Sequence, residues 1–185
     1  MRDLPPSANG ENFDPTEDEP ALDPSWIYLE NAYILCLRIM YSEHLTSKVA
    51  KACMTESFAI GILNNFNSED PREREYAKNI LYKIYGKLVC LRASIRRGIR
   101  NIFVTFIYES ETHNGIADLL DLLLGIIAGF AVPLKEEHRV FFHRTLIPLH
   151  FTKGYGYYYE QLRPIIMQYV TKEPSMSGSC QDGLP

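Results

Sequence analysis

Basic side chains gather in one segment of a chain that is acidic as a whole. The 185 residues carry a formal net charge of −4 at pH 7, yet residues 72–100 contain nine Lys or Arg against two Glu. Arg92, Arg96 and Arg100 recur at every fourth residue, which places them on one face if the segment is helical. A guanidinium group can hold a carboxylate or a phosphate in a two-pronged contact. The spacing therefore indicates a surface for an acidic ligand.

Lys83 and Lys87 repeat the same spacing on the preceding segment, with Tyr82 and Tyr85 beside them. If the two segments form antiparallel helices, we expect both basic rows to converge on one groove that binds an extended peptide. The alternative is that these charges are only the solvated face of two amphipathic helices, as charge runs usually are. A nucleic-acid partner, which would show steep salt dependence, is disfavoured by the acidic balance of the chain.

Patterns typical of catalysis or metal binding do not occur in the sequence. There is no HExxH pair, Gly-rich phosphate loop, GxSxG turn or CxxC pair. We therefore expect no enzyme activity, no cofactor and no metal, and we expect reduced thiols in a protein of the cytoplasm and/or nucleus. None of the histidines and cysteines shows the spacing of a metal site or a catalytic nucleophile; they are His44, His113, His138, His143, His150, Cys36, Cys53, Cys90 and Cys180.

Apolar residues recur every three or four positions between the two ends, which predicts an all-α protein. Asp70 followed by Pro71 is a strong helix start, and Asn114 is expected to cap another helix. Pro164 should kink the last helix or delay its start. The expected helices cover residues 26–41, 47–66 with a break near Met54-Thr55, 71–87, 92–108, 114–130, 135–146 and 157–171.

The composition divides the chain into three parts. Residues 1–24 hold five prolines and seven acids against one Arg, and we expect a disordered acidic tail. Residues 25–172 form the helical array, and residues 173–185, rich in Ser, Gly and Pro, form a flexible tail. Helices of similar length joined by short turns favour an α-solenoid of stacked pairs, with a compact bundle as the alternative. No apolar run is long enough to span a membrane.

Three stretches, made up of seven short motifs, are more specific than these patterns, and their order along the chain resembles one family. They are NSEDPREREY at 67–76 with IYGK at 84–87, NIF at 101–103 with FIYE at 106–109, HNGIA at 113–117, GFAVPLKEEH at 129–138 and LIPLH at 146–150. Over about residues 25–174 the chain resembles the B-prime regulatory subunits of protein phosphatase 2A.

The resemblance implies a curved array of HEAT-like helical pairs, about three to four of them in this chain, without catalytic activity. Members of the family dock on a scaffold subunit and a catalytic subunit to form a serine/threonine phosphatase. Their concave face captures substrate or adaptor proteins that carry a short L-x-x-I-x-E motif. The expected partners of this chain are therefore these two subunits and such motif proteins, not nucleic acid or membrane.

The resemblance also assigns the residues that would bind the motif, with several replacements. Tyr82-Lys83 stands where the family has His-Arg, and Asp121-Leu122 stands where it has an acid followed by Ile. Leu124 stands where the family has Gly. The full expected set is Tyr82, Lys83, Tyr85, Lys87, Arg92, Arg96, Asp121, Leu122, Ile126, Lys135 and His138.

These replacements predict weaker motif binding than is usual in the family. A lysine at 83 gives up the two-pronged contact of an arginine, and Asp121 withdraws its carboxylate by one methylene. We expect a loss of about 1–3 kcal/mol. Family members also continue through further repeats, so a shortened array should be marginally stable or depend on a partner. The alternative function is a divergent peptide-binding module that no longer assembles with the phosphatase.

Overall fold

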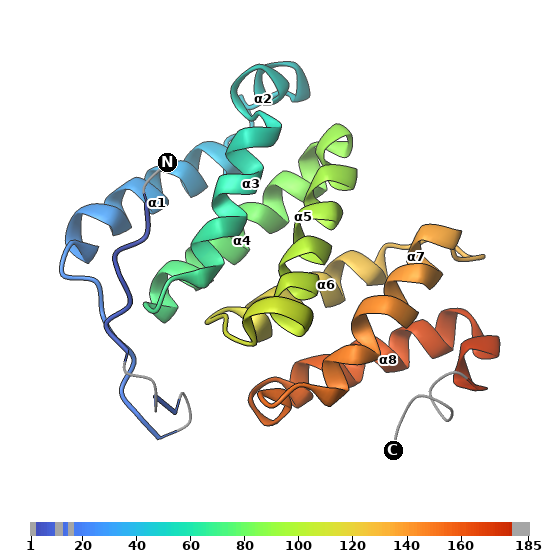
Figure 1. Ribbon diagram of the computed structural model, residues 1–185. Coiled ribbons are helices and arrows are strands. Elements are labelled where there is room, and N and C mark those ends of the chain that lie inside the picture. The colour runs from blue at the N-terminus through green and yellow to red at the C-terminus, as the bar shows by residue number, and fades with distance from the viewer. Residues whose placement is uncertain (1–2, 10–12, 15–16, 179–185) are drawn as a thin grey trace. The chain divides into compact units, whose positions relative to one another are not determined.

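The computed structural model describes residues 3–9, 13–14 and 17–178, and among them there is no β-strand. The all-α prediction is therefore confirmed for these residues, whose helices are shown in Figure 1. The chain divides into two compact units, Met1–Ile99 and Arg100–Pro185, which we describe separately. Within the part described, no helix is long and apolar enough to cross a membrane. Those residues also include no cluster of three or more potential metal ligands.

The described residues of the first unit form four complete α-helices and the start of a fifth. They are α1 (Trp26–Tyr41), α2 (Ser47–Cys53), α3 (Glu56–Asn64), α4 (Pro71–Lys87) and α5 (Arg92–Thr105), which continues past the end of the unit. The predicted break in the second segment is confirmed, because Thr55 caps a new helix by accepting a hydrogen bond from the N–H of Phe58. The predicted start at Asp70 is confirmed as well, since its carboxylate accepts from the N–H of Arg72 at 2.9 Å.

Helix α4 is the centre of this unit and contacts both α1 and α3 (Figure 1). Its buried face consists of the residues that the helical spacing predicts. None of these side chains is exposed to solvent: Ala77, Ile80, Leu81 and Ile84, together with Leu88 just beyond the helix. Burial of this apolar face fixes the rotation of α4 about its axis. It thereby decides which way the remaining side chains of α4 point.

A buried polar network joins α1 to the start of α4. The carboxylate of Glu73, which has no solvent exposure, accepts a hydrogen bond of 2.6 Å from the hydroxyl of Tyr33. The same hydroxyl accepts a bond of 2.7 Å from the amide of Asn65. A buried carboxylate is tolerated only where such partners surround it. The Tyr33 hydroxyl therefore links three segments of the unit.

The described residues before α1 are non-helical, and residues 7–9 lie against the loop that precedes α4. The hydroxyl of Ser7 and the N–H groups of Ala8 and Asn9 all donate to the carboxylate of Glu69. Burial alone would raise the pKa of Glu69, but these hydrogen bonds lower it below its ordinary value. Parts of the two expected tails, residues 1–2, 10–12, 15–16 and 179–185, lie outside the described residues.

Up to residue 178, the second unit contains the end of α5 and three further α-helices. They are α6 (Ile116–Ala128), α7 (Glu136–Phe141) and α8 (Tyr159–Lys172), with π-helical turns at Phe106–Ser110 and Phe142–Leu146 and 3-10 turns at Pro148–Phe151, Tyr155–Tyr157 and Pro174–Met176. Helix α6 packs along α8. The ring of Tyr169 on α8 lies 4.9 Å from that of Phe142 and is fully buried.

Four helix boundaries in this unit differ from the expectation. The helix expected from Asn114 begins instead at Ile116, behind Gly115, and no side chain caps it. The helices expected to end at 108 and 146 change to π-helical geometry at Phe106 and Phe142, so the apolar periodicity continues while the hydrogen-bond spacing widens. The last helix begins at Tyr159, two residues later than predicted, and contains Pro164.

Replacing Tyr33 by Phe tests the buried network. The change keeps the ring but leaves the Glu73 carboxylate and the Asn65 amide without the hydroxyl that they share. We expect the free energy of unfolding to fall by about 1–3 kcal/mol, measured by urea denaturation. Tyr28→Phe is the matched control, because Tyr28 lies on the exposed side of the same helix. Equal stability of the two variants would contradict this role of the network.

Candidate functional site

Two arginines at the start of α5 meet one tyrosine near the end of α4. The Nε of Arg92 donates to the carbonyl oxygen of Tyr85 at 2.8 Å, and its Nη2 donates to that of Gly86 at 3.2 Å. The Arg92 guanidinium also lies 5.2 Å from the centre of the Tyr85 ring. Arg96 donates from Nη1 to the Tyr85 hydroxyl at 3.1 Å. We call Tyr85, Arg92 and Arg96 the Tyr85 clamp.

The clamp is a positive site held in place by the fold. Helix α4 ends with carbonyl groups that have no partner within the helix, and Arg92 satisfies two of them. A guanidinium carries five N–H donors, so these contacts leave donors of Arg92 for a ligand. Tyr85 and both arginines are partly exposed. The arrangement can therefore accept a carboxylate or a phosphate without first reordering the arginines.

The lysines of α4 point the other way, toward α1. The Nζ of Lys87 donates to the carbonyl oxygens of Met40 and Ser42 at 3.3 and 3.5 Å, at the end of α1. The Nζ of Lys83 lies 4.0 Å from the centre of the Tyr41 ring. The expectation that the lysine and arginine rows converge in a groove between α4 and α5 is therefore wrong. Residues 83 and 85 are roughly 200° apart around a helix, so burial of one α4 face separates them.

The lysine row and the Tyr85 clamp instead flank the exposed ridge of α4. Tyr82, 53% exposed, and Gly86 lie on this ridge, one turn apart. A methyl group placed on Gly86 would meet no atom within 4 Å beyond its chain neighbours and the backbone of its own helix, so the ridge is low and open at this point. An extended ligand that crosses α4 at Gly86 would have Lys83 on one flank and the Tyr85 clamp on the other.

The remaining predicted site residues belong to the second unit. Asp121 and Lys135 are exposed, at the middle of α6 and just before α7. The side chains of Leu122 and Ile126 on α6 are buried, with 2% and 3% exposure. The role of these four residues in ligand binding stays a prediction. The two apolar side chains would have to become accessible before a ligand could touch them.

His138 is held by a ring stack within the second unit. Its imidazole lies 3.7 Å from the centre of the Phe130 ring, with an angle of 4° between the two planes. Nε2 lies 3.3 Å from the carboxylate of Glu137. His138 is buried, so the stack orders it within the protein and does not present it on the surface. Its role in ligand binding also stays a prediction.

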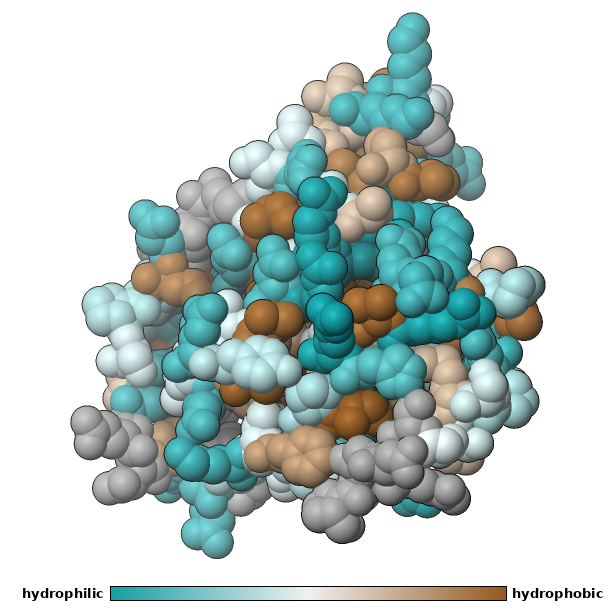
Figure 2. Space-filling model, turned by 45° about the vertical axis from the view of Figure 1, so that its right-hand side comes forward, coloured by the Kyte–Doolittle hydropathy of each residue, from teal (hydrophilic) through white to brown (hydrophobic). Residues whose placement is uncertain are grey.

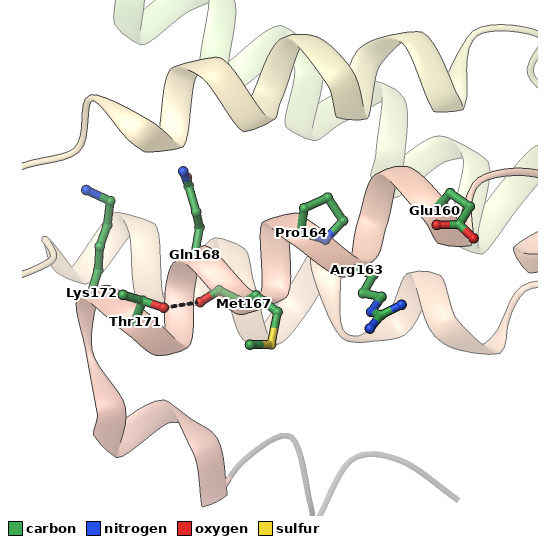
Figure 3. Close-up of a pocket in the computed structure, with 7 residues that line it drawn as sticks. All are labelled: Glu160, Arg163, Pro164, Met167, Gln168, Thr171 and Lys172. Carbon is green, nitrogen blue, oxygen red and sulfur yellow. Dashed lines mark hydrogen bonds between the residues drawn. The ribbon is translucent and has the colours of Figure 1, made fainter.

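A surface pocket lies along α8, and its lining includes none of the predicted site residues. Its lining consists of Glu160, Arg163, Pro164, Met167, Gln168, Thr171 and Lys172, all from one helix (Figure 3). The Nζ of Lys172 donates to the carbonyl oxygens of Ala128 and Phe130, so it anchors the end of α6. On the face drawn in Figure 2, hydrophilic side chains predominate and apolar ones lie among them in small groups.

Sequence reasoning missed two residues that shape these sites, Tyr41 and Phe130. Each contacts a predicted site residue through the face of its ring, Lys83 in one case and His138 in the other. Neither pair is linked by charge, although Phe130 and His138 both lie in the stretch at 129–138. The tyrosine lies 42 positions from its lysine, so helical spacing has no bearing on the contact.

Comparison with known proteins identifies the family. The model of the family described as "Protein phosphatase 2A regulatory B subunit (B56 family)" matches residues 1–184. The delta isoform of the phosphatase 2A 56 kDa regulatory subunit from Oryctolagus cuniculus is 49% identical over 179 residues, which are 96% of this chain and 30% of the relative. The chain belongs to the B56 family.

Other B56 proteins from distant organisms give the same result. The B-prime beta isoform of the 57 kDa regulatory subunit from Arabidopsis thaliana is 48% identical over all of this chain and 38% of its own length. The human 56 kDa beta isoform is 47% identical over all of this chain and 37% of its own length. The resemblance to B-prime regulatory subunits is confirmed. B56 proteins are regulatory subunits and not catalytic ones, and this chain spans about a third of the length of these relatives.

Proposed function

We propose that this chain is a non-catalytic regulatory subunit of a protein phosphatase 2A complex that recruits proteins with acidic-aliphatic motifs of the L-x-x-I-x-E type. The observation that carries the proposal is the Tyr85 clamp, in which Arg92 and Arg96 are ordered around one partly exposed tyrosine. Membership of the B56 family supports the regulatory role. The phosphatase scaffold and catalytic subunits are the proposed partners, in the cytoplasm or the nucleus.

The clamp suits the acidic residue of such a motif. A carboxylate that reaches Arg92 and Arg96 would accept charge-assisted hydrogen bonds, which are shorter and stronger than neutral ones. Because the protein already holds both arginines near Tyr85, little side-chain entropy is lost when the ligand arrives. The Tyr85 ring and the exposed ring of Tyr82 offer apolar surface to the neighbouring part of the peptide.

The replacement of a family arginine by Lys83 should weaken binding of the motif. Lys83 carries a single ammonium that rests on Tyr41, where the family has an arginine able to make a two-pronged contact. The clamp would therefore supply most of the positive charge that the motif meets on α4 and α5. We keep the expectation of an affinity loss of about 1–3 kcal/mol relative to longer family members.

Charge-matched arginine variants test the role of the clamp. Arg96→Ala removes a clamp residue, whereas Arg97→Ala removes the same charge from an exposed neighbour outside the clamp. We expect Arg96→Ala to weaken binding of a synthetic L-x-x-I-x-E peptide about tenfold or more, and Arg97→Ala less than threefold, by isothermal titration calorimetry. Equal losses in the two variants would show that only general charge matters.

Substitutions of Gly86 test whether the ligand crosses the open ridge of α4. A Cβ at this exposed position meets no atom within 4 Å beyond its chain neighbours and the backbone of its own helix, and both alanine and tryptophan have a higher helix propensity than glycine. Gly86→Ala and Gly86→Trp should therefore both fold, with melting temperatures at or above that of the wild type. We expect Gly86→Ala to bind the peptide within about twofold of the wild type and Gly86→Trp to lose about tenfold or more. Unchanged binding by Gly86→Trp would place the ligand elsewhere.

Assembly with the phosphatase is tested by co-purification. The chain, carrying an affinity tag, is mixed at low salt with purified scaffold and catalytic subunits, and a full-length relative serves as the positive control. We expect the chain to retain both subunits. Failure to do so, together with intact peptide binding, would favour the alternative function of a peptide-binding module that acts without the phosphatase.

A further inference from the structure

Tyr41 and Lys83 form a contact that the proposed binding role does not use. Tyr41 is the last residue of α1, its side chain is 63% exposed, and its ring centre lies 4.0 Å from the Nζ of Lys83. We propose that Tyr41 is a positioning residue that holds Lys83 away from an acidic ligand on α4 and thereby lowers the affinity of the site. This inference rests on the proposed function and concerns how that same site is regulated.

The Tyr41 ring is kept in place by the second lysine of the row. Lys87 lies one turn after Lys83 on the same side of α4, and its Nζ donates to the carbonyl oxygens of Met40 and Ser42. These two residues flank Tyr41 in the chain, and the side chain of Met40 is buried. The end of α1 is thus fastened on both sides of the tyrosine, so its ring stays within reach of Lys83.

The position of Lys83 over the ring competes with ligand binding. A lysine ammonium above an aromatic ring is attracted by the negative face of the ring. The Tyr41 ring lies on the α1 side of Lys83, whereas the open ridge at Gly86 and the Tyr85 clamp lie on its other side. To pair with a ligand carboxylate on the ridge, Lys83 has to leave the ring. The attraction at an exposed site corresponds to an affinity change of about two- to fivefold.

The two lysines therefore have separate roles, although they share a helix face and a spacing. Lys87 is structural, since its ammonium satisfies carbonyls at a helix end. Lys83 carries a charge that can pair with a ligand only when its ammonium leaves the ring of the aromatic residue at position 41. A lysine suits this role better than an arginine, because its flexible stem can swing a compact charge between two partners.

A double-mutant cycle with peptide titrations tests the proposal. Affinity for the synthetic L-x-x-I-x-E peptide is measured for the wild type, Tyr41→Ala, Lys83→Ala and the double variant, with Tyr41→Phe as the matched control that keeps the ring. We expect Tyr41→Ala to bind about two- to fivefold tighter than the wild type and Tyr41→Phe to match it. In the Lys83→Ala background, loss of the tyrosine should change nothing.

A second measurement does not depend on the peptide. Lysines are dimethylated with a carbon-13 label, which preserves their charge, and their methyl resonances are recorded by NMR. The resonance of Lys83, assigned with Lys83→Arg, should be displaced upfield by the ring current of Tyr41 and should return downfield in Tyr41→Ala. Lys87 should keep its resonance in both proteins.

Each result decides one part of the inference. An unmoved Lys83 resonance in Tyr41→Ala, or an affinity that stays the same or falls in that variant, would overturn the role of Tyr41. An equal gain in the Lys83→Ala background would show that the tyrosine acts directly on the ligand, which also overturns it. If the peptide binds none of these proteins while the resonance shift is present, the proposed function fails and the ring contact stands alone.

Discussion

Basic side chains close the C-terminal ends of α1, α4 and α6, and the candidate site depends on this arrangement. The last carbonyl groups of an α-helix have no partner within the helix and need donors from elsewhere. Lys87 supplies them to the end of α1, Arg92 to the end of α4, and Lys172 to the end of α6. Arg74 does the same for the turn before α4, bonding the carbonyls of Ser68 and Glu69.

Because cations serve this structural purpose, only part of the positive charge in residues 72–100 is left to attract a ligand. Most of that charge already has an intramolecular partner: a carbonyl for Arg74, Lys87 and Arg92, a carboxylate for Arg72 and Lys78, and a tyrosine for Lys83 and Arg96. The segment is therefore not a uniform ligand surface. What it offers an acidic ligand is a short, ordered part of the charge, held at the junction of α4 and α5.

Much of the fold could be predicted from the sequence because it depends on interactions between residues that are close in the chain. The helix start at Asp70, the break at Thr55 and the buried face of α4 follow from capping and from apolar spacing. The start at Ile116 could not be predicted in this way, because Asn114 had the right residue type for a cap but the helix formed behind Gly115 without one. A propensity for capping does not guarantee that the geometry of a cap is reached.

The candidate site could be predicted in part, and the reason lies in what spacing can show. Spacing places Lys83 and Lys87 on one face of α4, but it does not say which neighbour that face meets. The direction was set by burial of the opposite apolar residues, which turned the lysines toward α1 and Tyr85 toward α5. The contact of Tyr41 with Lys83 carries no local signal, because 42 positions separate the two residues, and it arises only from the tertiary fold. Phe130 and His138 lie eight positions apart in one stretch, but no helical or strand spacing indicates that their rings stack.

The account depends most on whether an acidic peptide reaches the guanidinium groups around Tyr85. Nitrogen-15 NMR of the arginine Nε–H groups reports this directly, because each resonance responds to a new hydrogen-bond partner. Titration with an L-x-x-I-x-E peptide should shift the Arg92 and Arg96 resonances in a saturable manner and leave Arg97 unchanged. Saturable binding that moves neither clamp resonance, or that moves Arg97 equally, would contradict the account.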